Sequence, residues 1–103
     1  MQVRDAKLSD LKNLSVLFNS YRMFYGKESD IRVAEEFLRS RIENKDSKIF
    51  ICEFNNELSG FVQLYPIFSS TRVSKYWLLN DLFVDINKRG KGYSKLLIER
   101  SKK

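Results

Sequence analysis

The chain has 103 residues, of which 43% are hydrophobic, 14% aromatic and 31% charged, and this composition indicates one globular domain over residues 1–103 rather than a disordered chain. No apolar run approaches the roughly 20 residues that a membrane-spanning helix needs, and the N-terminus lacks a signal-peptide core, so we expect a cytoplasmic protein. The formal net charge is +6, and the whole excess lies in residues 88–103, which hold seven basic residues and one acidic residue. Such a basic segment favours an anionic ligand.

The first predicted elements are a short strand over residues 2–4 and an amphipathic helix that follows it. Ser9 or Asp10 is a candidate N-cap for this helix, and Gly26 is a candidate stop. The apolar residues in between recur at spacings of 3, 4, 3 and 4, which places them on one helical face. They are Leu11, Leu14, Phe18, Tyr21 and Tyr25.

A second helix is predicted from Ser29 or Asp30 to about Asn44, after which the apolar period changes to two. Residues 48–54 then predict a strand, and the Asn-rich turn after it leads into a partner strand over residues 60–65. We expect Pro66 to end that strand, because proline cannot donate a ladder hydrogen bond. Residues 67–74 are interpreted as a loop.

Residues 75–84 form the longest strand candidate, and strict alternation gives it two apolar faces, as in a central strand. One face would carry Tyr76, Leu78, Asn80, Leu82 and Val84, and the other Trp77, Leu79, Asp81 and Phe83. A turn over residues 85–89 leads to a last helix that begins near residues 90–92. The predicted fold class is therefore α+β, with flanking helices packed on one face of a mainly antiparallel sheet.

The segment with chemical content runs from this long strand through a basic turn with two glycines into the last helix. Glycines allow backbone N–H groups to approach a ligand closely, and a helix N-terminus adds free donors and a positive dipole end. Arg89 and Lys91 add full charges, and an arginine can bind a phosphate with two hydrogen bonds. The segment therefore predicts a phosphate or diphosphate site, although it matches neither a Walker loop nor a G-x-G-x-x-G dinucleotide motif.

These residues resemble a known family. Arg89-x-x-Gly92-x-Ser94 is similar to the Q/R-x-x-G-x-G/A signature of the GCN5-related N-acetyltransferases (GNAT), and residues 82–85 look like the strand that precedes that signature. Ser94 departs from the usual glycine or alanine, but serine is also small. The resemblance implies a GNAT-like fold in which acetyl-CoA donates an acetyl group to a primary amine of a small molecule, by direct attack in a ternary complex.

The resemblance also implies positions for the cofactor. The backbone of the strand end would pair with the pantetheine arm like an added strand, and the loop would hold the diphosphate mainly through backbone N–H groups. Carried over position by position, the cofactor-binding residues are Leu82, Phe83, Val84, Arg89, Gly90, Lys91, Gly92, Tyr93 and Ser94. We predict no metal site, because the chain has no histidine and only one cysteine.

Asp81 and Asn80 are the candidate catalytic residues. Asp81 lies among apolar neighbours before the signature and could act as a base or an amine anchor; the alternative is a structural hydrogen-bond acceptor. Asn80 stands near a position where many relatives have glutamate. An asparagine cannot serve as a base, but it could orient the substrate or a water molecule that relays the proton.

Several aromatic residues could line the acceptor pocket or merely pack. These candidates are Tyr21, Tyr25 and Tyr65, together with the Phe68–Ser70 loop. Trp77 is interpreted as a core residue, and Cys52 as an inert buried thiol in an apolar strand, with no internal disulfide.

A family domain normally continues beyond this last helix with a fifth strand, which splays from the fourth to form the cofactor gap, and a further helix. The resemblance therefore covers about the first two thirds of such a domain and implies a truncated one, whose fourth strand is an exposed edge. An exposed edge favours pairing with a second copy, so a homodimer is one expectation. Alternatives are a catalytically inactive CoA-binding or self-associating remnant and, as the weakest, a nucleic-acid-binding module; we expect neither nucleic acid nor a membrane as partner.

Overall fold

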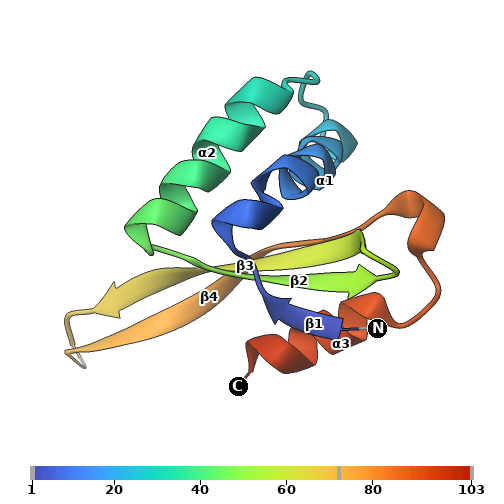
Figure 1. Cartoon of the computed structure of the whole chain (residues 1–103). Coiled ribbons are helices and arrows are strands. Elements are labelled where there is room, and N and C mark those ends of the chain that lie inside the picture. Colours follow the sequence, from blue (N-terminus) through green and yellow to red (C-terminus); the bar gives the residue numbers. More distant parts are fainter. Residues whose placement is uncertain (1, 72, 103) are drawn as a thin grey trace.

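The computed structural model describes residues 2–71 and 73–102. Four strands form one antiparallel sheet in the order β1-β2-β3-β4, and three α-helices flank it (Figure 1). The elements are β1 (Gln2–Asp5), α1 (Leu11–Phe24), α2 (Ile31–Asn44), β2 (Lys48–Phe54), β3 (Glu57–Ser69), β4 (Ser74–Val84) and α3 (Tyr93–Ser101), with 3-10 turns at Leu8–Asp10 and Ile86–Lys88. The predicted α+β class is confirmed.

The helices cover both faces of the sheet, so the expectation that they pack on one face is wrong. Helices α1 and α2 lie above the sheet in Figure 1 and α3 lies below it. Two buried clusters correspond to these layers. The α1–α2 cluster is centred on Leu14, Leu38, Ile51 and Phe61, and the α3 cluster contains Cys52, Val62, Val84, Tyr93 and Leu97. The short last helix has its own apolar face, and only the second face of the sheet is free to bury it.

The ends of α1 and α2 follow the predicted capping residues. Asp30 caps α2 by accepting a hydrogen bond from the Val33 N–H at 3.2 Å, and α1 gives way to Gly26, whose φ of +86° is left-handed. Lys45 ends α2 with a φ of 53°, a conformation that glycine or asparagine adopts more readily. Local sequence chemistry therefore sets the end of α1 and the start of α2, but it does not explain the end of α2 at Lys45.

The Asp10 carboxylate binds Arg4 instead of capping the first turn of α1. Arg4 donates from both terminal nitrogens at 2.8 and 2.9 Å and, through Nε, to Glu53 at 3.3 Å. The Lys7 N–H also donates to Asp10, at 2.8 Å. These bonds, led by those from Arg4, hold the pKa of Asp10 below its usual range. The cluster ties β1 to β2 and to the start of α1.

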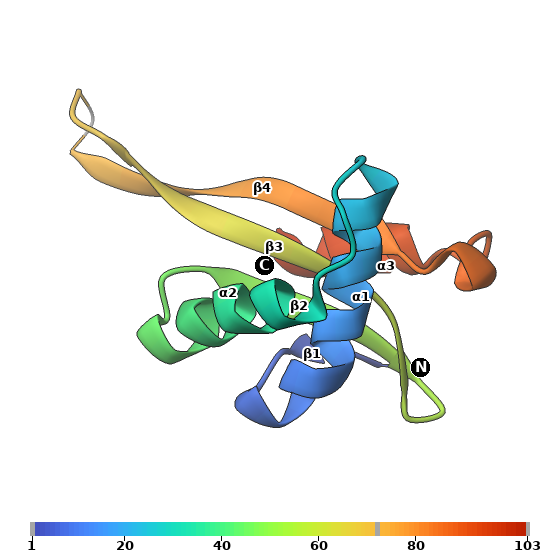
Figure 2. The same ribbon diagram turned by 90° about the horizontal axis from the view of Figure 1, so that it is seen from above.

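Strands β3 and β4 form a long hairpin arm that projects beyond the rest of the molecule (Figure 2). The prediction that Pro66 ends β3 is wrong, because β3 continues to Ser69 and Pro66 pairs with Trp77. Strand β2 pairs with β3 only as far as Leu64, so Pro66 has a single neighbouring strand, and such an edge position tolerates a proline. Of the predicted loop over residues 67–74, residues 67–69 belong to β3 and Ser74 begins β4.

Strict alternation along β4 is also wrong, because the pairing register shifts between Gln63 and Leu64, opposite Asn80. Strict alternation put Leu78 and Asp81 on opposite faces of the strand. The register shift places them on the same face. β4 is an edge strand with β3 as its neighbour, as the resemblance implied, so the central strand that its two apolar faces indicated is wrong. Leu78 and Leu79 are 47% and 38% exposed. Across the part of the chain that the structure describes, no helix is both long and apolar enough to cross a membrane.

Candidate functional site

The turn after β4 is held in place by local hydrogen bonds. Asp85 caps the 3-10 turn by accepting from the Asn87 N–H at 3.0 Å, and its own N–H donates to the Ser59 carbonyl at 2.8 Å. Lys88 donates to Glu57 at 2.8 Å, and this bond lowers the pKa of the Glu57 carboxyl. The chain is thereby brought back against the start of β3 before it enters the glycine loop, residues 89–94.

Both glycines of this loop are left-handed, and both face open space. Gly90 and Gly92 have φ values of +84° and +80°, and no atom lies within 4 Å of where a Cβ would stand on either. Gly92 is the N-cap of α3, and its carbonyl accepts from the Leu96 N–H at 3.2 Å. The N–H groups that precede Leu96 have no carbonyl within the helix to bind, so they mark a positive helix end that suits an anion.

A cleft of about 370 Å³ opens in front of this helix end. Its walls are the end of β4, the glycine loop and the last residues of α1. It is lined by Phe24, Tyr25, Leu82, Phe83, Val84, Arg89, Gly90, Gly92, Tyr93 and Ser94. The structure therefore brings together every residue predicted to bind the cofactor except Lys91, which is exposed outside the cleft lining. That these residues bind acetyl-CoA stays a prediction.

Arg89 has partners within the chain that the motif alone did not indicate. Its Nε donates to the Val84 carbonyl at 2.9 Å, and its guanidinium lies 5.1 Å from the Phe24 ring centroid and 5.4 Å from that of Phe83. The side chain thus ties the loop to the end of β4 and to the last turn of α1. These contacts engage Nε and the faces of the guanidinium plane, while both terminal nitrogens keep N–H groups for an anion.

Behind the cleft, the Asp81 carboxylate is buried and accepts four hydrogen bonds. The Tyr21 hydroxyl and the Asn80 amide donate to Oδ1 at 2.8 and 3.1 Å. The Tyr65 hydroxyl and the Gln63 amide donate to Oδ2 at 3.0 Å each. A carboxylate offers about four acceptor positions, so this one is saturated.

The tyrosines of this Asp81 network stay protonated donors. Burial is the main cause that raises the pKa of Tyr21, and the bond to Asp81 raises it further. Burial and the negative charge of Asp81 raise the pKa of Tyr65 in the same way. The Ser47 hydroxyl donates to Oε1 of the Gln63 side-chain amide at 2.9 Å and extends the network. Neutral phenols that donate inward fix the position of the carboxylate and of α1 relative to the sheet.

Tyr21 connects the Asp81 network to the wall of the cleft. Its ring centroid lies 5.2 Å from that of Tyr25 and 5.7 Å from that of Phe83, both of which line the cleft. Sequence reasoning missed Gln63 and Phe24 as members of this region. The position of Gln63, two residues after Phe61 on a strand face that is otherwise apolar, was a signal that could have found it.

Other candidates lie elsewhere. Phe68 is 76% exposed near the tip of the hairpin arm, where it lines a separate cavity, so the Phe68–Ser70 segment does not join the cleft. Cys52 is buried, and burial raises the pKa of its thiol, as an inert thiol requires. Among residues 2–71 and 73–102, no cluster of three or more His, Cys, Asp or Glu side chains could hold a metal ion.

An edge strand, a left-handed glycine loop and an open helix end therefore meet at one cleft. The model of the acetyltransferase (GNAT) family matches residues 14–103. The chain is 47% identical over 102 residues to an uncharacterized N-acetyltransferase, YhfO, of Bacillus subtilis strain 168, and the match covers 99% of this chain and 68% of that protein. The chain therefore belongs to the GNAT family, and the predicted family and acetyltransferase class are confirmed.

Solved structures agree with this assignment. A crystal structure of a probable acetyltransferase is 36% identical and matches with a TM-score of 0.92, covering 99% of this chain and 69% of that chain. A predicted acetyltransferase from Clostridium acetobutylicum, solved with acetyl-CoA, is 16% identical with a TM-score of 0.78 and shows the same fold; it covers 96% of this chain and 69% of that one. Family members use acetyl-CoA as acetyl donor.

Proposed function

We propose that this chain transfers the acetyl group of acetyl-CoA to a primary amine of a small molecule. The observation that carries the proposal is the open space in front of Gly90 and Gly92, at the unpaired N–H groups that begin α3. Donors of this kind suit a diphosphate, because they approach it closely and carry the positive end of the helix dipole. Arg89 adds a cation beside the same cleft.

The residues present fit the rest of the cofactor as well. β4 ends at Val84 as an edge strand beside the cleft, and an edge strand offers backbone groups to an extended chain such as the pantetheine arm. The aromatic rings of Phe24 and Tyr25 form the opposite wall. The related fold solved with acetyl-CoA supports the same cofactor here.

The proposed reaction is direct attack in a ternary complex. When bound, acetyl-CoA supplies an activated acyl carbon. A neutral amine nitrogen would form the new C–N bond as the C–S bond breaks; the nitrogen would lose one proton to solvent, and CoA would leave as the thiolate and take up a proton from solvent. The four donors on Asp81 support a positioning role for this residue, because its carboxylate could accept that proton only if one of these donors moved away. We propose that Asp81 and Asn80 fix the acceptor side of the cleft and that water carries the proton away.

Paired substitutions at Gly92 test the diphosphate site by calorimetric titration of acetyl-CoA. Aspartate and asparagine have nearly the same shape and tolerate left-handed φ to a similar degree, so Gly92→Asp and Gly92→Asn differ mainly in one negative charge. We expect the aspartate variant to bind about tenfold more weakly than the asparagine variant, because its carboxylate repels the diphosphate.

Gly26 provides the matched control. Like Gly92, it has a left-handed φ, of +86°, and open surroundings, but it does not line the cleft. Gly26→Asp and Gly26→Asn should bind acetyl-CoA equally. Equal binding by the two Gly92 variants would show that no anion occupies the glycine loop.

The acceptor class is tested by the release of CoA thiol with a panel of small primary amines and the matching alcohols. Turnover with amines alone supports amine acetylation, whereas turnover with alcohols alone contradicts it. Binding of acetyl-CoA without thiol release from any acceptor would identify a cofactor-binding protein without catalytic turnover. The two readouts therefore separate the binding step from the chemical step.

A further inference from the structure

A second cavity, of about 550 Å³, lies at the opposite end of α3 from the glycine loop. The end of β1, the end of α2, the start of β2 and the last turn of α3 enclose it, and we call it the rear cavity. Its lining includes the apolar side chains of Ile42, Ile49 and Phe50. The acetyl transfer proposed above uses none of these residues, so the rear cavity has no role in that reaction.

The charged residues of the rear cavity are mostly basic. Lys45, Lys48 and Arg100 line it, against one carboxylate, Asp5. Asp5 is 70% exposed in its side chain and lies 3.9 Å from Arg100, a long distance for an ion pair. Within the described residues neither Lys45 nor Lys48 forms an ion pair. The lining therefore carries an uncompensated positive charge.

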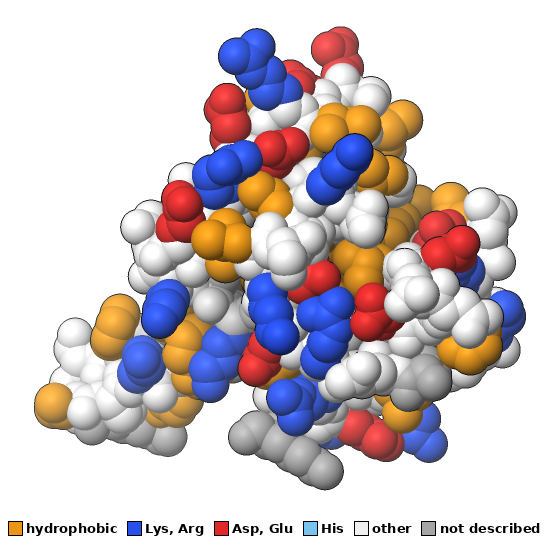
Figure 3. Space-filling model, viewed as in Figure 1, with side chains coloured by type: hydrophobic (Ala, Val, Ile, Leu, Met, Phe, Trp, Pro, Cys, Tyr) orange, Lys and Arg blue, Asp and Glu red, His pale blue; other side chains and the backbone are white. Residues whose placement is uncertain are grey.

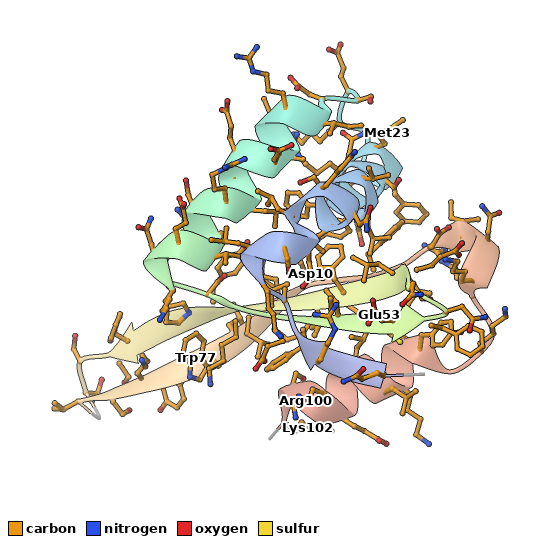
Figure 4. The ribbon with its side chains drawn as sticks, viewed as in Figure 1. Asp10, Met23, Glu53, Trp77, Arg100 and Lys102 are labelled. Carbon is orange, nitrogen blue, oxygen red and sulfur yellow. The ribbon has the colours of Figure 1, made fainter. Side chains whose placement is uncertain are left out.

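Two lysine ammonium groups, one of them from the lining of the rear cavity, lie over the ring of Trp77. The Nζ of Lys48 lies 4.3 Å from the ring centroid of Trp77, and the Nζ of Lys75 lies 4.9 Å from it. Figure 4 shows Trp77 on the hairpin arm and Arg100 on α3, both below β2, and in Figure 3 blue side chains outnumber red ones across the lower middle of this face. Two ammonium groups on one indole repel each other, and an anion beside them relieves that repulsion.

Two of the cations are held in place before any ligand binds. The Arg100 guanidinium lies 5.2 Å from the ring centroid of Phe50, a cation–π contact that limits its motion. The Lys48 ammonium lies 4.3 Å from the ring centroid of Trp77 and is held by the same kind of contact. Fixed cations lose less conformational entropy when they bind an anion.

We propose that the rear cavity binds a small phosphorylated molecule that has an apolar or aromatic body. The phosphate contacts Lys45, Lys48 and Arg100, and the body lies on the apolar lining. The cations surround a concave space instead of forming a stripe along the surface, which favours a small molecule over a nucleic-acid strand. Because α3 separates the rear cavity from the cleft, both ligands can be bound at once.

Phenyl phosphate is the probe. It is titrated into the whole chain, first without CoA and then with the chain saturated with CoA, and binding is followed by the NMR chemical shifts of the backbone amides. We expect the Ala6, Ser47 and Ile49 amides to shift, with equal affinity in the absence of CoA. Inorganic phosphate and phenol should each bind more weakly, because each supplies half of the recognised chemistry. Loss of the shifts on adding CoA would place the phosphate in the cleft and overturn the proposal, as would the absence of any shift at millimolar phenyl phosphate.

Variants separate specific binding from general charge attraction. Lys45→Gln and Lys48→Gln should each weaken phenyl phosphate binding about tenfold, as expected for a lost charge-assisted hydrogen bond, with the amide spectrum otherwise unchanged. Lys12→Gln is the matched control, since it removes the same charge from an exposed position on α1. Equal weakening by all three would contradict a defined site. Tighter binding of short single-stranded DNA to the same amides would replace the small molecule with a nucleic acid.

Discussion

The two polar regions at the end of β4 differ in how far their hydrogen-bonding groups are satisfied. In the Asp81 network a buried carboxylate accepts four bonds from α1, β3 and β4. The glycine loop, a few residues later, leaves the first N–H groups of α3 without a helical partner and faces a cleft. A saturated network stabilises and positions the fold, whereas an unsaturated one is available to a ligand. Substitutions in the first region should therefore change stability, and those in the second should change affinity.

The largest stability effect is expected at the centre of the Asp81 network. Asp81→Asn places an NH2 group against donors and removes the charge that they bind, so it should lower the free energy of unfolding by about 3 kcal/mol. Tyr21→Phe removes one donor of four and should cost about 1 kcal/mol. Urea unfolding midpoints at constant m-value measure both effects.

The same variants distinguish positioning from proton transfer. In a positioning role, Tyr21→Phe and Asp81→Asn change the rate of thiol release without moving the pH dependence of that rate. Loss of a titrating limb in Asp81→Asn alone would identify Asp81 as the base. If Asp81→Asn lowered the free energy of unfolding by less than Tyr21→Phe does, the Asp81 carboxylate would not be the centre that makes the four bonds stabilising.

The sequence predicted the parts of these regions that depend on near neighbours. Capping residues and apolar spacing placed α1, α2 and β2 within about a residue, and the glycine motif placed the loop before α3. A structural acceptor role for Asp81 was one of the two alternatives, but its partners were not predicted. Tyr21 and Asp81 are 60 residues apart, and periodicity carries no information about which distant side chains meet. The register shift opposite Asn80 and the continuation of β3 through Pro66 depend on which strand lies alongside, and local propensity does not specify this.

Arg89 belongs to both kinds of region, because it lies in the glycine loop but already has partners within the chain. The Nε2 of glutamine stands the same number of bonds from the backbone as the Nε of arginine, so Arg89→Gln can keep the bond to the Val84 carbonyl without the charge. Lysine keeps the charge and loses both that donor and the planar stacking on Phe24 and Phe83. If the tie to β4 shapes the cleft, we expect Arg89→Gln to bind acetyl-CoA about tenfold more tightly than Arg89→Lys.

Calorimetry of the two Arg89 variants decides between shape and charge. Tighter binding by Arg89→Lys would assign Arg89 to the diphosphate instead. The signature that the chain resembles allows glutamine or arginine at this position, and a shared backbone tie explains why a charge is not essential there. The Gly92 pair remains the test of the anion itself, because aspartate and asparagine differ mainly in charge, whereas the two Arg89 variants also differ in their contacts with Val84, Phe24 and Phe83.

An effect no larger than that of Tyr21→Phe is expected from a third satisfied cluster, Arg4 and Asp10, which lies away from the cleft. The folded state lowers the pKa of Asp10, mainly through the bonds from Arg4, so this carboxylate stabilises the fold above its unfolded pKa of about 3.9 and loses that contribution as the pH falls through its folded value. Asp10→Asn should therefore cost about 1 kcal/mol at pH 7, and the difference from the unsubstituted chain should shrink below about pH 4.

Urea unfolding at several pH values, together with acetyl-CoA titration at pH 7, completes this comparison. A stability difference that persists unchanged at low pH would show that packing, and not the ion pair, causes the loss. Acetyl-CoA affinity should not change in Asp10→Asn, because Asp10 contacts neither the glycine loop nor the wall of the cleft. A loss of affinity equal to that of the Gly92→Asp variant would mean that global stability controls cofactor binding, and the division between a closed, stabilising region and an open, binding region would not hold.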